Sequence, residues 1–591
     1  MRFATYALAA SVALCAPADA AGQRHNVLIF VADGLRYVGV TPKTAPTMWK
    51  LKHDGVDFTN SHSLYPTITT VNASAIATGH YVGDTGNFGN TIYTGYPVAG
   101  TNGAPITFQE DDTLLSDLAA HYNGNYLNET SFLAAAREAG FATAAMGKVG
   151  PTAIQDIKQR DGNGTIVIDD ALNTQKGITV SADINAAIQA AGIAQTAPKT
   201  DVPNNAQQQY MISVATKVVL PKLVASGHPF AMLYWSRDPD ATQHAQKDGV
   251  GKLTPGINGP TAIAGIKDAD DTLAALLAAL KAQGLDKTTD VFVTADHGFS
   301  TIDRHSATSA AAKMTFPKVP AGETPPGLVA IDLADGLGLP MLDPFNKNAP
   351  IDYKAGNLPS FGTAALGTDA AKPDVYVVAN GGSDHIYLPN ANAKEFAAKI
   401  ADVLSREDYV SGIFVDDALG DVPGALPMSA VNLKGSALTP QPSIIESFAS
   451  HPISGCSPLL MCAAEVADTT LETGQGMHGT FGRADTRNFM AAIGPDFKIR
   501  FADTAPVSNA DINPTLARIV GLDITPRGDL KGRVASEALK GGAKVKVSRK
   551  TQTSASAANG ERTVLQYQQV GQTRYFDAAG FPGRTVGLET H

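Results

Sequence analysis

Six carboxylate and imidazole side chains stand where polar residues follow apolar runs or lie in short motifs rich in Asp, His and Gly. They are Asp33, Asp240, His244, Asp296, His297 and His478. Carboxylate oxygens and imidazole nitrogens together suit zinc and similar divalent ions. Three groups of each kind can hold two ions, so the pattern predicts a two-metal site. Simple turns and surface histidines remain the alternative reading of each piece alone.

A hydroxyl group could complete this chemistry. Thr69 precedes Asn72 and a run of small residues over 73–79 that predicts a short helix. A hydroxyl at a helix N-terminus beside metal ions is placed to become a nucleophile. Two metal ions about 4 Å apart can bind both the attacking and the leaving oxygen of an in-line displacement. Ordinary helix capping by Thr69 and Asn72 is the alternative.

The elements that must position these residues have the pattern of an α/β fold. Apolar runs predict buried strands over 26–32, 141–146, 229–235 and 290–295. Helices are predicted over 131–140 and 261–283. Strands that alternate with helices form a mostly parallel central sheet with helices on both faces. Ligands bind at the carboxyl ends of the strands of such sheets, where the polar residues stand.

The chain of 591 residues is long enough for one large domain with an insertion. The expected parts are a catalytic core over 24–300 and 471–532, an inserted cap over 301–470 and a C-terminal extension over 533–591. The core would close with a strand at 488–493 and a helix at 511–520, and the extension would hold a hairpin at 564–576.

The N-terminal segment has the pattern of a signal peptide over residues 1–20. Arg2 supplies the positive charge, 6–14 are apolar, and Ala18-Asp19-Ala20 has the form of a cleavage site. The chain is therefore expected to be periplasmic or secreted. In that setting Cys456 and Cys462 are expected to form a disulfide across a small loop.

Composition excludes some classes of partner. The chain has 46 Lys and Arg against 56 Asp and Glu, a net charge of −10, which argues against a nucleic-acid-binding surface. Beyond the leader, no apolar run reaches the roughly 20 residues of a membrane span. No pattern in the chain indicates an oligomeric state.

The motifs taken together resemble the alkaline phosphatase superfamily, and most closely its type I phosphodiesterase/nucleotide pyrophosphatase family. The matching segments, in the family's order, are Val-Ala-Asp33-Gly-Leu-Arg, Tyr-Pro-Thr-Ile-Thr69-Thr-Val-Asn72 with Ala-Thr-Gly79, Pro-Asp240-Ala-Thr-Gln-His244, Thr-Ala-Asp296-His297-Gly and Gly-Met-His478-Gly. They span residues 26–482. The resemblance implies an exported, metal-dependent hydrolase of small phosphoesters, with two divalent ions and zinc favoured.

The resemblance also implies a role for each residue. One metal would be held by Asp240, His244 and His478. The other would be held by Asp33, Asp296 and His297, with the Thr69 hydroxyl as an additional ligand. Thr69 would attack phosphorus and form a phosphothreonine, and Asn72 would donate a hydrogen bond to a phosphoryl oxygen.

Two of these assignments have neighbours that could replace them. Thr70 could stand in for Thr69, and Asp238 for Asp240, but only Thr69 and Asp240 have the family's spacing to Asn72 and His244. Two further motifs resemble ligands by composition. Ser383-Asp384-His385 opens an apolar strand and is interpreted as structural, and Asp303 with His305 is interpreted as a solvated loop.

The chain departs from the family at two places. Thr70 stands directly after the nucleophile, where nucleotide pyrophosphatases have an aromatic residue that stacks on a base. Lys148, in Gly-Lys-Val-Gly150, is similar to an active-site lysine of sulfatases and of some threonine-dependent phosphomonoesterases, although the latter pair it with an arginine where Gly150 stands here. Lys148 could bind a phosphate oxygen, or it could be a surface residue packed on the sheet edge.

Three alternatives to a phosphodiesterase follow. A phosphomonoesterase with Lys148 on the phosphate is the first. A sulfatase is the second, because Cys456-Ser-Pro-Leu-Leu begins like a formylglycine signature, although Leu460 replaces its arginine. A non-catalytic binding protein with the same fold is the third.

Overall fold

The computed structural model describes residues 25–158, 164–174, 177–458 and 461–589. The predicted signal peptide over 1–20 lies outside the described residues. Within these ranges, no helix combines the length and the apolar character needed to cross a membrane.

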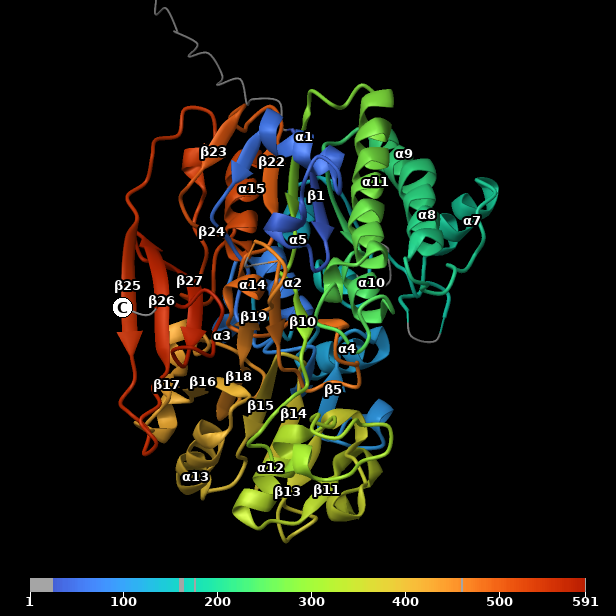
Figure 1. Cartoon of the computed structure of the whole chain (residues 1–591). Helices are drawn as coiled ribbons and strands as arrows, with labels where there is room; N and C mark the ends of the chain where they lie inside the picture. The colour runs from blue at the N-terminus through green and yellow to red at the C-terminus, as the bar shows by residue number, and fades with distance from the viewer. Residues whose placement is uncertain (1–24, 159–163, 175–176, 459–460, 590–591) are drawn as a thin grey trace, which may run out of the picture.

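A central eight-stranded sheet forms the upper half of the molecule (Figure 1). Its order is β23-β2-β22-β9-β1-β8-β6-β7. The bounds are β1 Asn26–Ala32, β2 Val56–Phe58, β6 Ala142–Gly147, β7 Ile166–Asp169, β8 Phe230–Ser236, β9 Thr289–Thr294, β22 Met490–Ile493 and β23 Phe501–Asp503. The five strands from β9 to β7 are parallel, and β22 is antiparallel to β9. The predicted mostly parallel sheet is confirmed.

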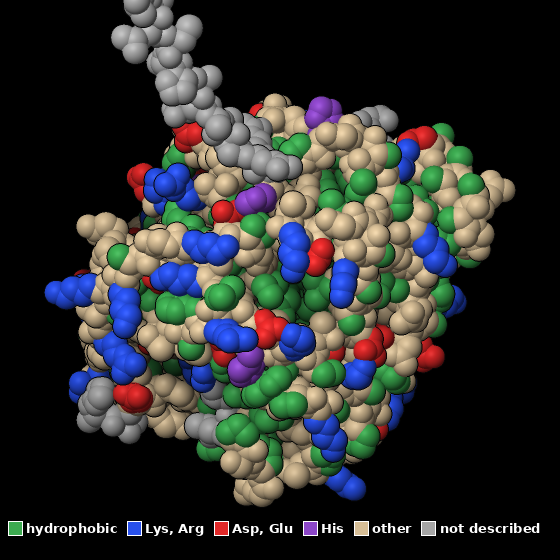
Figure 2. Space-filling model, turned by 90° about the horizontal axis from the view of Figure 1, so that it is seen from above, with side chains coloured by type: hydrophobic (Ala, Val, Ile, Leu, Met, Phe, Trp, Pro, Cys, Tyr) green, Lys and Arg blue, Asp and Glu red, His purple; other side chains and the backbone are tan. Residues whose placement is uncertain are grey.

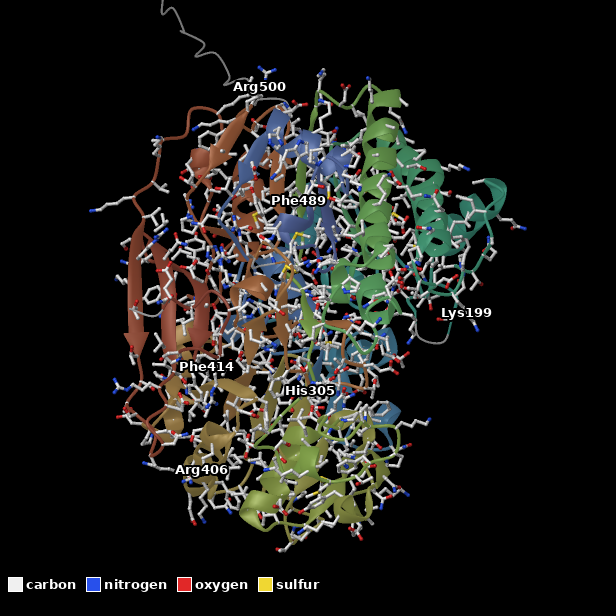
Figure 3. The ribbon with its side chains drawn as sticks, viewed as in Figure 1. Lys199, His305, Arg406, Phe414, Phe489 and Arg500 are labelled. Carbon is white, nitrogen blue, oxygen red and sulfur yellow. A yellow bond between two sulfur atoms is a disulfide. The ribbon has the colours of Figure 1, made fainter. Side chains whose placement is uncertain are left out.

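Helices cover both faces of this sheet because its strands are apolar on both sides. One face packs against α1 (Pro46–Asp54), α8 (Asn205–Val214) and α11 (Pro260–Ala282). The other packs against α2 (Thr69–Thr78), α4 (Asp112–His121), α5 (Phe132–Glu138) and α15 (Ile512–Val520). Phe489, which Figure 3 labels, is fully buried in the first of these cores.

A second eight-stranded sheet lies below the first in Figure 1 and has the order β12-β11-β13-β14-β15-β18-β16-β17. Its main strands are β11 Met341–Asp343, β13 Ala364–Leu366, β14 Val375–Ala379, β15 Ser383–Tyr387, β16 Val410–Val415 and β18 Ile444–Phe448, with short edges β12 Ala349–Ile351 and β17 Leu426–Pro427. The helices α12 (Leu328–Leu337) and α13 (Ala393–Arg406) contribute to its own hydrophobic core.

Short elements join the two sheets near the metal-ligand motifs. The strands β10 (Ser300–Ile302), β19 (Ser450–Pro452), β20 (Ala463–Glu465) and β21 (Gly476–Met477) form a small sheet, and α10 (Asp240–Ala245) and α14 (Arg483–Thr486) lie beside it. Cys456 and Cys462 form the predicted disulfide in this region. The disulfide uses the Cys456 thiol that a formylglycine would require.

The C-terminal residues form a three-stranded antiparallel sheet along one side of the molecule (Figure 1). Its strands are β25 (Ser548–Thr553), β26 (Val564–Val570) and β27 (Thr573–Gly580). The hairpin expected at 564–576 corresponds to β26 and β27. The expectation missed β25, because its sequence Ser-Arg-Lys-Thr-Gln-Thr is polar throughout and offers no apolar alternation.

Candidate active site

The carboxylates of the predicted set meet at the carboxyl edge of the central sheet. Asp33 follows β1, Asp296 follows β9, and Asp240 begins α10. The backbone N–H of Asp240 donates to the carbonyl oxygen of Asp33 at 3.0 Å, which ties the two segments together. Gly34 has a φ of +67°, and a Cβ atom there would lie 2.7 Å from the Phe299 ring, so this turn requires glycine.

The three histidines share one arrangement. The Nδ1 atom of each lies 2.8 Å from a backbone carbonyl oxygen, with the pairs His244–Gly476, His297–Gly298 and His478–Thr67. Because a carbonyl oxygen only accepts, each Nδ1 carries the proton and each Nε2 keeps its lone pair when the ring is neutral. Histidines that bind metals are commonly oriented by such a hydrogen bond.

Asp240 is the centre of the first group of ligand atoms. Its Oδ1 atom lies 3.1 Å from His244 Nε2 and 3.6 Å from His478 Nε2. The ring of His478 stacks on the ring of His297 with centroids 3.5 Å apart, so the second group begins beside the first. Ligand atoms of Asp240, His297 and His478 all lie within 4.8 Å of one another.

Asp33, Asp296 and His297 form the second group, and their ligand atoms also lie within 4.8 Å of one another. Among the described residues, Asp33 Oδ1, Asp240 Oδ1 and Asp296 Oδ2 are buried and accept no hydrogen bond. Buried carboxylate oxygens are costly unless they are paired or coordinate a metal. These orphaned oxygens, together with the free Nε2 atoms, fit divalent metal ions such as zinc.

The pKa shifts of the ligand residues also favour bound cations. Burial, together with the charges of Asp240 and Asp296, raises the pKa of Asp33 well above its ordinary value. Burial lowers the pKa of His297, but the carboxylates of Asp296 and Asp33 outweigh it and raise that pKa to about 9. Crowded negative charge of this kind is relieved by bound cations.

Thr69 begins α2, a helix in which every residue is buried. Its Oγ1 atom lies 3.3 Å from His297 Nε2 and 3.5 Å from Lys148 Nζ. The hydroxyl of Thr70 points away and donates to the carbonyl oxygen of Gly89 at 3.0 Å. The structure therefore brings Thr69, and not Thr70, to the metal-ligand groups.

Lys148 follows β6 and is only 3% exposed, so its interpretation as a surface residue is wrong. Its Nζ atom lies 3.0 Å from Asp33 Oδ2 and 3.3 Å from Asp240 Oδ2. A third carboxylate, that of Glu110, lies 3.0 Å away. Burial opposes the charged ammonium, but these carboxylates hold the pKa of Lys148 well above its ordinary value. A fixed positive charge therefore lies beside Thr69.

Asn72 does not have the orientation that its expected role requires. Its Nδ2 group donates to the carbonyl oxygens of Leu64 at 3.1 Å and Ile68 at 3.2 Å, which uses both of its protons. Its Oδ1 atom accepts from the backbone N–H of Leu64 at 2.8 Å and from Asn509 at 3.0 Å. Side chains in a helix lean toward its N-terminus, and here this directs Asn72 onto the preceding loop and away from a phosphate beside Thr69.

Asn90 is a better placed amide, which the sequence analysis missed. Its Oδ1 atom accepts the backbone N–H of Thr70 at 3.0 Å and so caps the first turn of α2. Its Nδ2 group has no acceptor within the described residues. Asn90 lies 21 residues after Thr69, in a separate loop, so no local spacing connects the two.

Two other residues position the site from behind. The Trp235 Nε1–H donates to Asp33 Oδ2 at 2.7 Å, and both side chains are fully buried. Asp485 Oδ2 accepts the backbone N–H of Gly479 at 3.1 Å, which holds the loop that carries His478. The sequence identifies Trp235 only as a strand residue, because its contact with Asp33 forms only in the folded chain.

The alternative ligand Asp238 lies away from the metal-ligand groups. Its Oδ1 atom accepts the Thr242 hydroxyl at 2.9 Å, and its Oδ2 atom accepts the backbone N–H of Asn204 at 3.2 Å. Burial and the nearby Asp268 carboxyl raise the pKa of Asp238 to about 7. Asp238 therefore caps a helix, whereas Asp240 meets the histidines.

The other two motifs that resembled ligands lie in structural positions. Asp384 and His385 are buried within β15, and burial lowers the pKa of His385 to about 3, which keeps the ring neutral. His305 is exposed and its Nδ1 lies 2.7 Å from Asp303 Oδ1 (Figure 3). Neither set belongs to the two groups of ligand atoms.

The chain matches a known protein family and is similar to solved structures. A family model described as type I phosphodiesterase/nucleotide pyrophosphatase matches residues 27–427. Among solved structures, human ectonucleotide pyrophosphatase/phosphodiesterase 5 is similar, with a TM-score of 0.50 and 14% identity over 85% of this chain and 96% of that chain. At this identity the likeness concerns the fold alone. No curated protein matches the chain by sequence.

Proposed function

The chain belongs to the type I phosphodiesterase/nucleotide pyrophosphatase family and is a phosphoric ester hydrolase, and we propose that Thr69 is its nucleophile at a two-metal site. One observation carries the proposal. Ligand atoms of Asp240, His297 and His478 lie together, as do those of Asp33, Asp296 and His297, and the Thr69 hydroxyl lies 3.3 Å from His297 Nε2. A hydroxyl in that setting is placed for phosphoryl transfer.

Two divalent ions, with zinc favoured, would be held by Asp240, His244 and His478 and by Asp33, Asp296 and His297, with Thr69 as an additional ligand. When bound, such ions stabilise negative charge on the reacting oxygens and lower the pKa of hydroxyl groups and water.

The residues of the chain would then divide the work of an in-line displacement. Thr69 Oγ1 releases its proton to solvent and forms a bond to phosphorus, the bond to the ester oxygen breaks, and the leaving group departs with that electron pair. Water later displaces Thr69 and restores its hydroxyl. The N-terminus of α2 favours negative charge beside Thr69, and the free Nδ2 group of Asn90 is available to donate to a phosphoryl oxygen.

The test compares two adjacent threonines. Thr69→Ala in zinc-loaded protein should lose hydrolysis of bis(p-nitrophenyl) phosphate by a factor of about 10³ or more, because the nucleophile is removed. Thr70→Ala is the matched control, since its hydroxyl bonds to Gly89. Hydrolysis by Thr69→Ala at the wild-type rate would rule out the assignment.

A monoesterase is the second candidate, and the position of Lys148 favours it. Its ammonium group lies 3.5 Å from Thr69 Oγ1, where it could neutralise a second phosphate charge that only a monoester carries. Thr70 also offers no aromatic ring for a nucleobase. Lys148→Met should reduce hydrolysis of p-nitrophenyl phosphate more than that of the bis ester. An equal effect on both esters would argue against this role.

The expected cap over 301–470 contacts both the loop after His478 and the segment after Asn90, and Gly382 N–H donates to the carbonyl oxygen of His478 at 2.9 Å. Asn380 Nδ2 donates to the carbonyl oxygen of Thr91 at 2.9 Å, directly after Asn90. The cap would therefore help to form the substrate-binding surface beside Asn90. Export to the periplasm or medium is supported by the leader pattern over 1–20 and by the Cys456–Cys462 disulfide.

A further inference from the structure

A cavity of about 650 Å³ lies between the core and the C-terminal sheet, and no metal-ligand residue lines it. Its walls come from the loop at 59–60, from the segment that begins with α14, and from β25 and β26. Figure 2 shows several Lys and Arg side chains on the left of the molecule, the side on which Figure 1 places β25–β27. A volume of this size is typical of small-molecule sites.

Two half-buried arginines, Arg483 and Arg487, form the inner wall. Arg483 donates only to neutral groups, among them the carbonyl oxygen of Ser61 at 3.1 Å. Arg487 donates to the carbonyl oxygen of Thr59 at 2.8 Å, and its Nε atom is buried without an acceptor among the described residues. Burial lowers the pKa of Arg483 to about 10, the nearby Asp577 carboxylate opposes this shift, and the charge of Arg487 adds to it. Two adjacent guanidinium groups therefore lack a carboxylate in hydrogen-bond contact.

Arg549 and Lys550 of β25 add two exposed cations at the opening. Neither forms an ion pair within the part of the chain that the structure describes. The carboxylates of Asp577 and Glu589 also line the cavity, and Asp577 accepts from His62 Nε2 at 2.9 Å. The lining is net positive, although the whole chain carries a charge of −10. A local excess of this kind attracts anions.

We infer that this cavity binds a small phosphate-bearing anion. Guanidinium groups donate in a planar fork that matches phosphate oxygens, and four cations around one space favour a multivalent anion over chloride. The side-chain amides of Asn60 and Gln568 also line the cavity, where they form hydrogen bonds to each other. The site is separate from the Thr69 centre and does not depend on the reaction there.

The test uses the two exposed cations, whose replacement does not disturb the core. Equilibrium dialysis measures binding of inorganic phosphate and of adenosine monophosphate to the zinc-loaded full chain. The variant is Arg549→Gln with Lys550→Gln. The matched control is Lys544→Gln with Lys546→Gln, which removes the same charge from exposed positions nearby that do not line the cavity. Hydrolysis of bis(p-nitrophenyl) phosphate is followed in parallel.

The wild-type chain and the control should bind phosphate at a site that the Arg549/Lys550 variant binds about tenfold more weakly, with hydrolysis unchanged in all three. Tighter binding of adenosine monophosphate would identify an organic phosphate as the ligand, and equal binding would identify the phosphate group alone. Equal phosphate binding by all three proteins would overturn the inference, as would equally tight binding of citrate. If the wild-type chain did not hydrolyse the bis ester, the Thr69 proposal would be refuted, whereas the difference in phosphate binding between the variants would still stand.

Discussion

Trp235→Phe isolates the contribution of one hydrogen bond behind the metal-ligand groups. The indole Nε1–H donates to Asp33 Oδ2 at 2.7 Å, and Lys148 Nζ, 3.0 Å from the same oxygen, remains in the variant. A hydrogen bond to a charged group contributes about 1.5–3 kcal/mol. Because Lys148 still pairs with this oxygen, the loss of stabilising free energy at Asp33 should lie at the lower end of that range. Replacing indole by phenyl also leaves a cavity that costs about 1–2 kcal/mol.

The loss of orientation should weaken zinc binding by about 10–100-fold, the usual effect of removing a partner of a metal ligand. Competition with a chelator of known affinity measures the constant, and thermal unfolding measures stability. Tyr234→Phe is the control, since Tyr234 lies on the opposite face of β8 and its buried hydroxyl has no hydrogen-bond partner among the described residues. If Trp235→Phe bound zinc as tightly as Tyr234→Phe, the argument that Trp235 orients Asp33 would be wrong.

Three further predictions concern the amide, the metals and pH. Asn90→Ala should lower kcat by about 10²–10³ with little change in Tm, as for an oxyanion donor. Asn72→Ala should lower Tm more than kcat, because four hydrogen bonds are lost. Steady-state kinetics and calorimetry separate the two effects, and the reverse pattern would assign the phosphoryl-oxygen contact to Asn72. Removing metal with a chelator should lower Tm, and added zinc should restore it in wild type but less in His244→Ala, whereas a Tm insensitive to zinc would contradict the two-metal site. Burial and the Asp496 carboxyl raise the pKa of Asp290 to about 8, so the folded chain keeps a proton that the unfolded chain releases near pH 4, and stability falls as pH rises through this interval. Asp290→Asn should therefore lose less Tm than wild type between about pH 5 and pH 8, and parallel Tm profiles would contradict the shift.

The sequence determined the core of the fold because its strands carry strong local signals. The run 26–32 is apolar throughout, as a strand buried on both faces must be, and it forms β1 with the same bounds. Ser131 and Gly140 marked the ends of α5, where Ser131 accepts the N–H of Ala134 and Gly140 has a φ of +89°. The polar strand β25 gave no such signal, because pairing with β26 alone defines it.

Site residues were predictable where a motif defined both the residue type and the spacing. They were less predictable where the role depends on the direction in which the side chain points. Asp240 and His244 lie one helical turn apart, so one face of α10 presents both. Asn72 has a similar spacing to Thr69, but a bond to Leu64 turns its amide away. Asn90 lies beside the start of α2 only through the fold, so spacing along the chain could not identify it.

The identity of the atom that receives the phosphoryl group tests most directly whether Thr69 is the nucleophile. Zinc-loaded enzyme mixed with bis(p-nitrophenyl) phosphate is quenched in acid during the first turnovers, digested and mapped by mass spectrometry. We expect a phosphoryl ester on Thr69, none on Thr70, and none in Thr69→Ala. Phosphorylation of another residue, or turnover by Thr69→Ala at the wild-type rate, would contradict it.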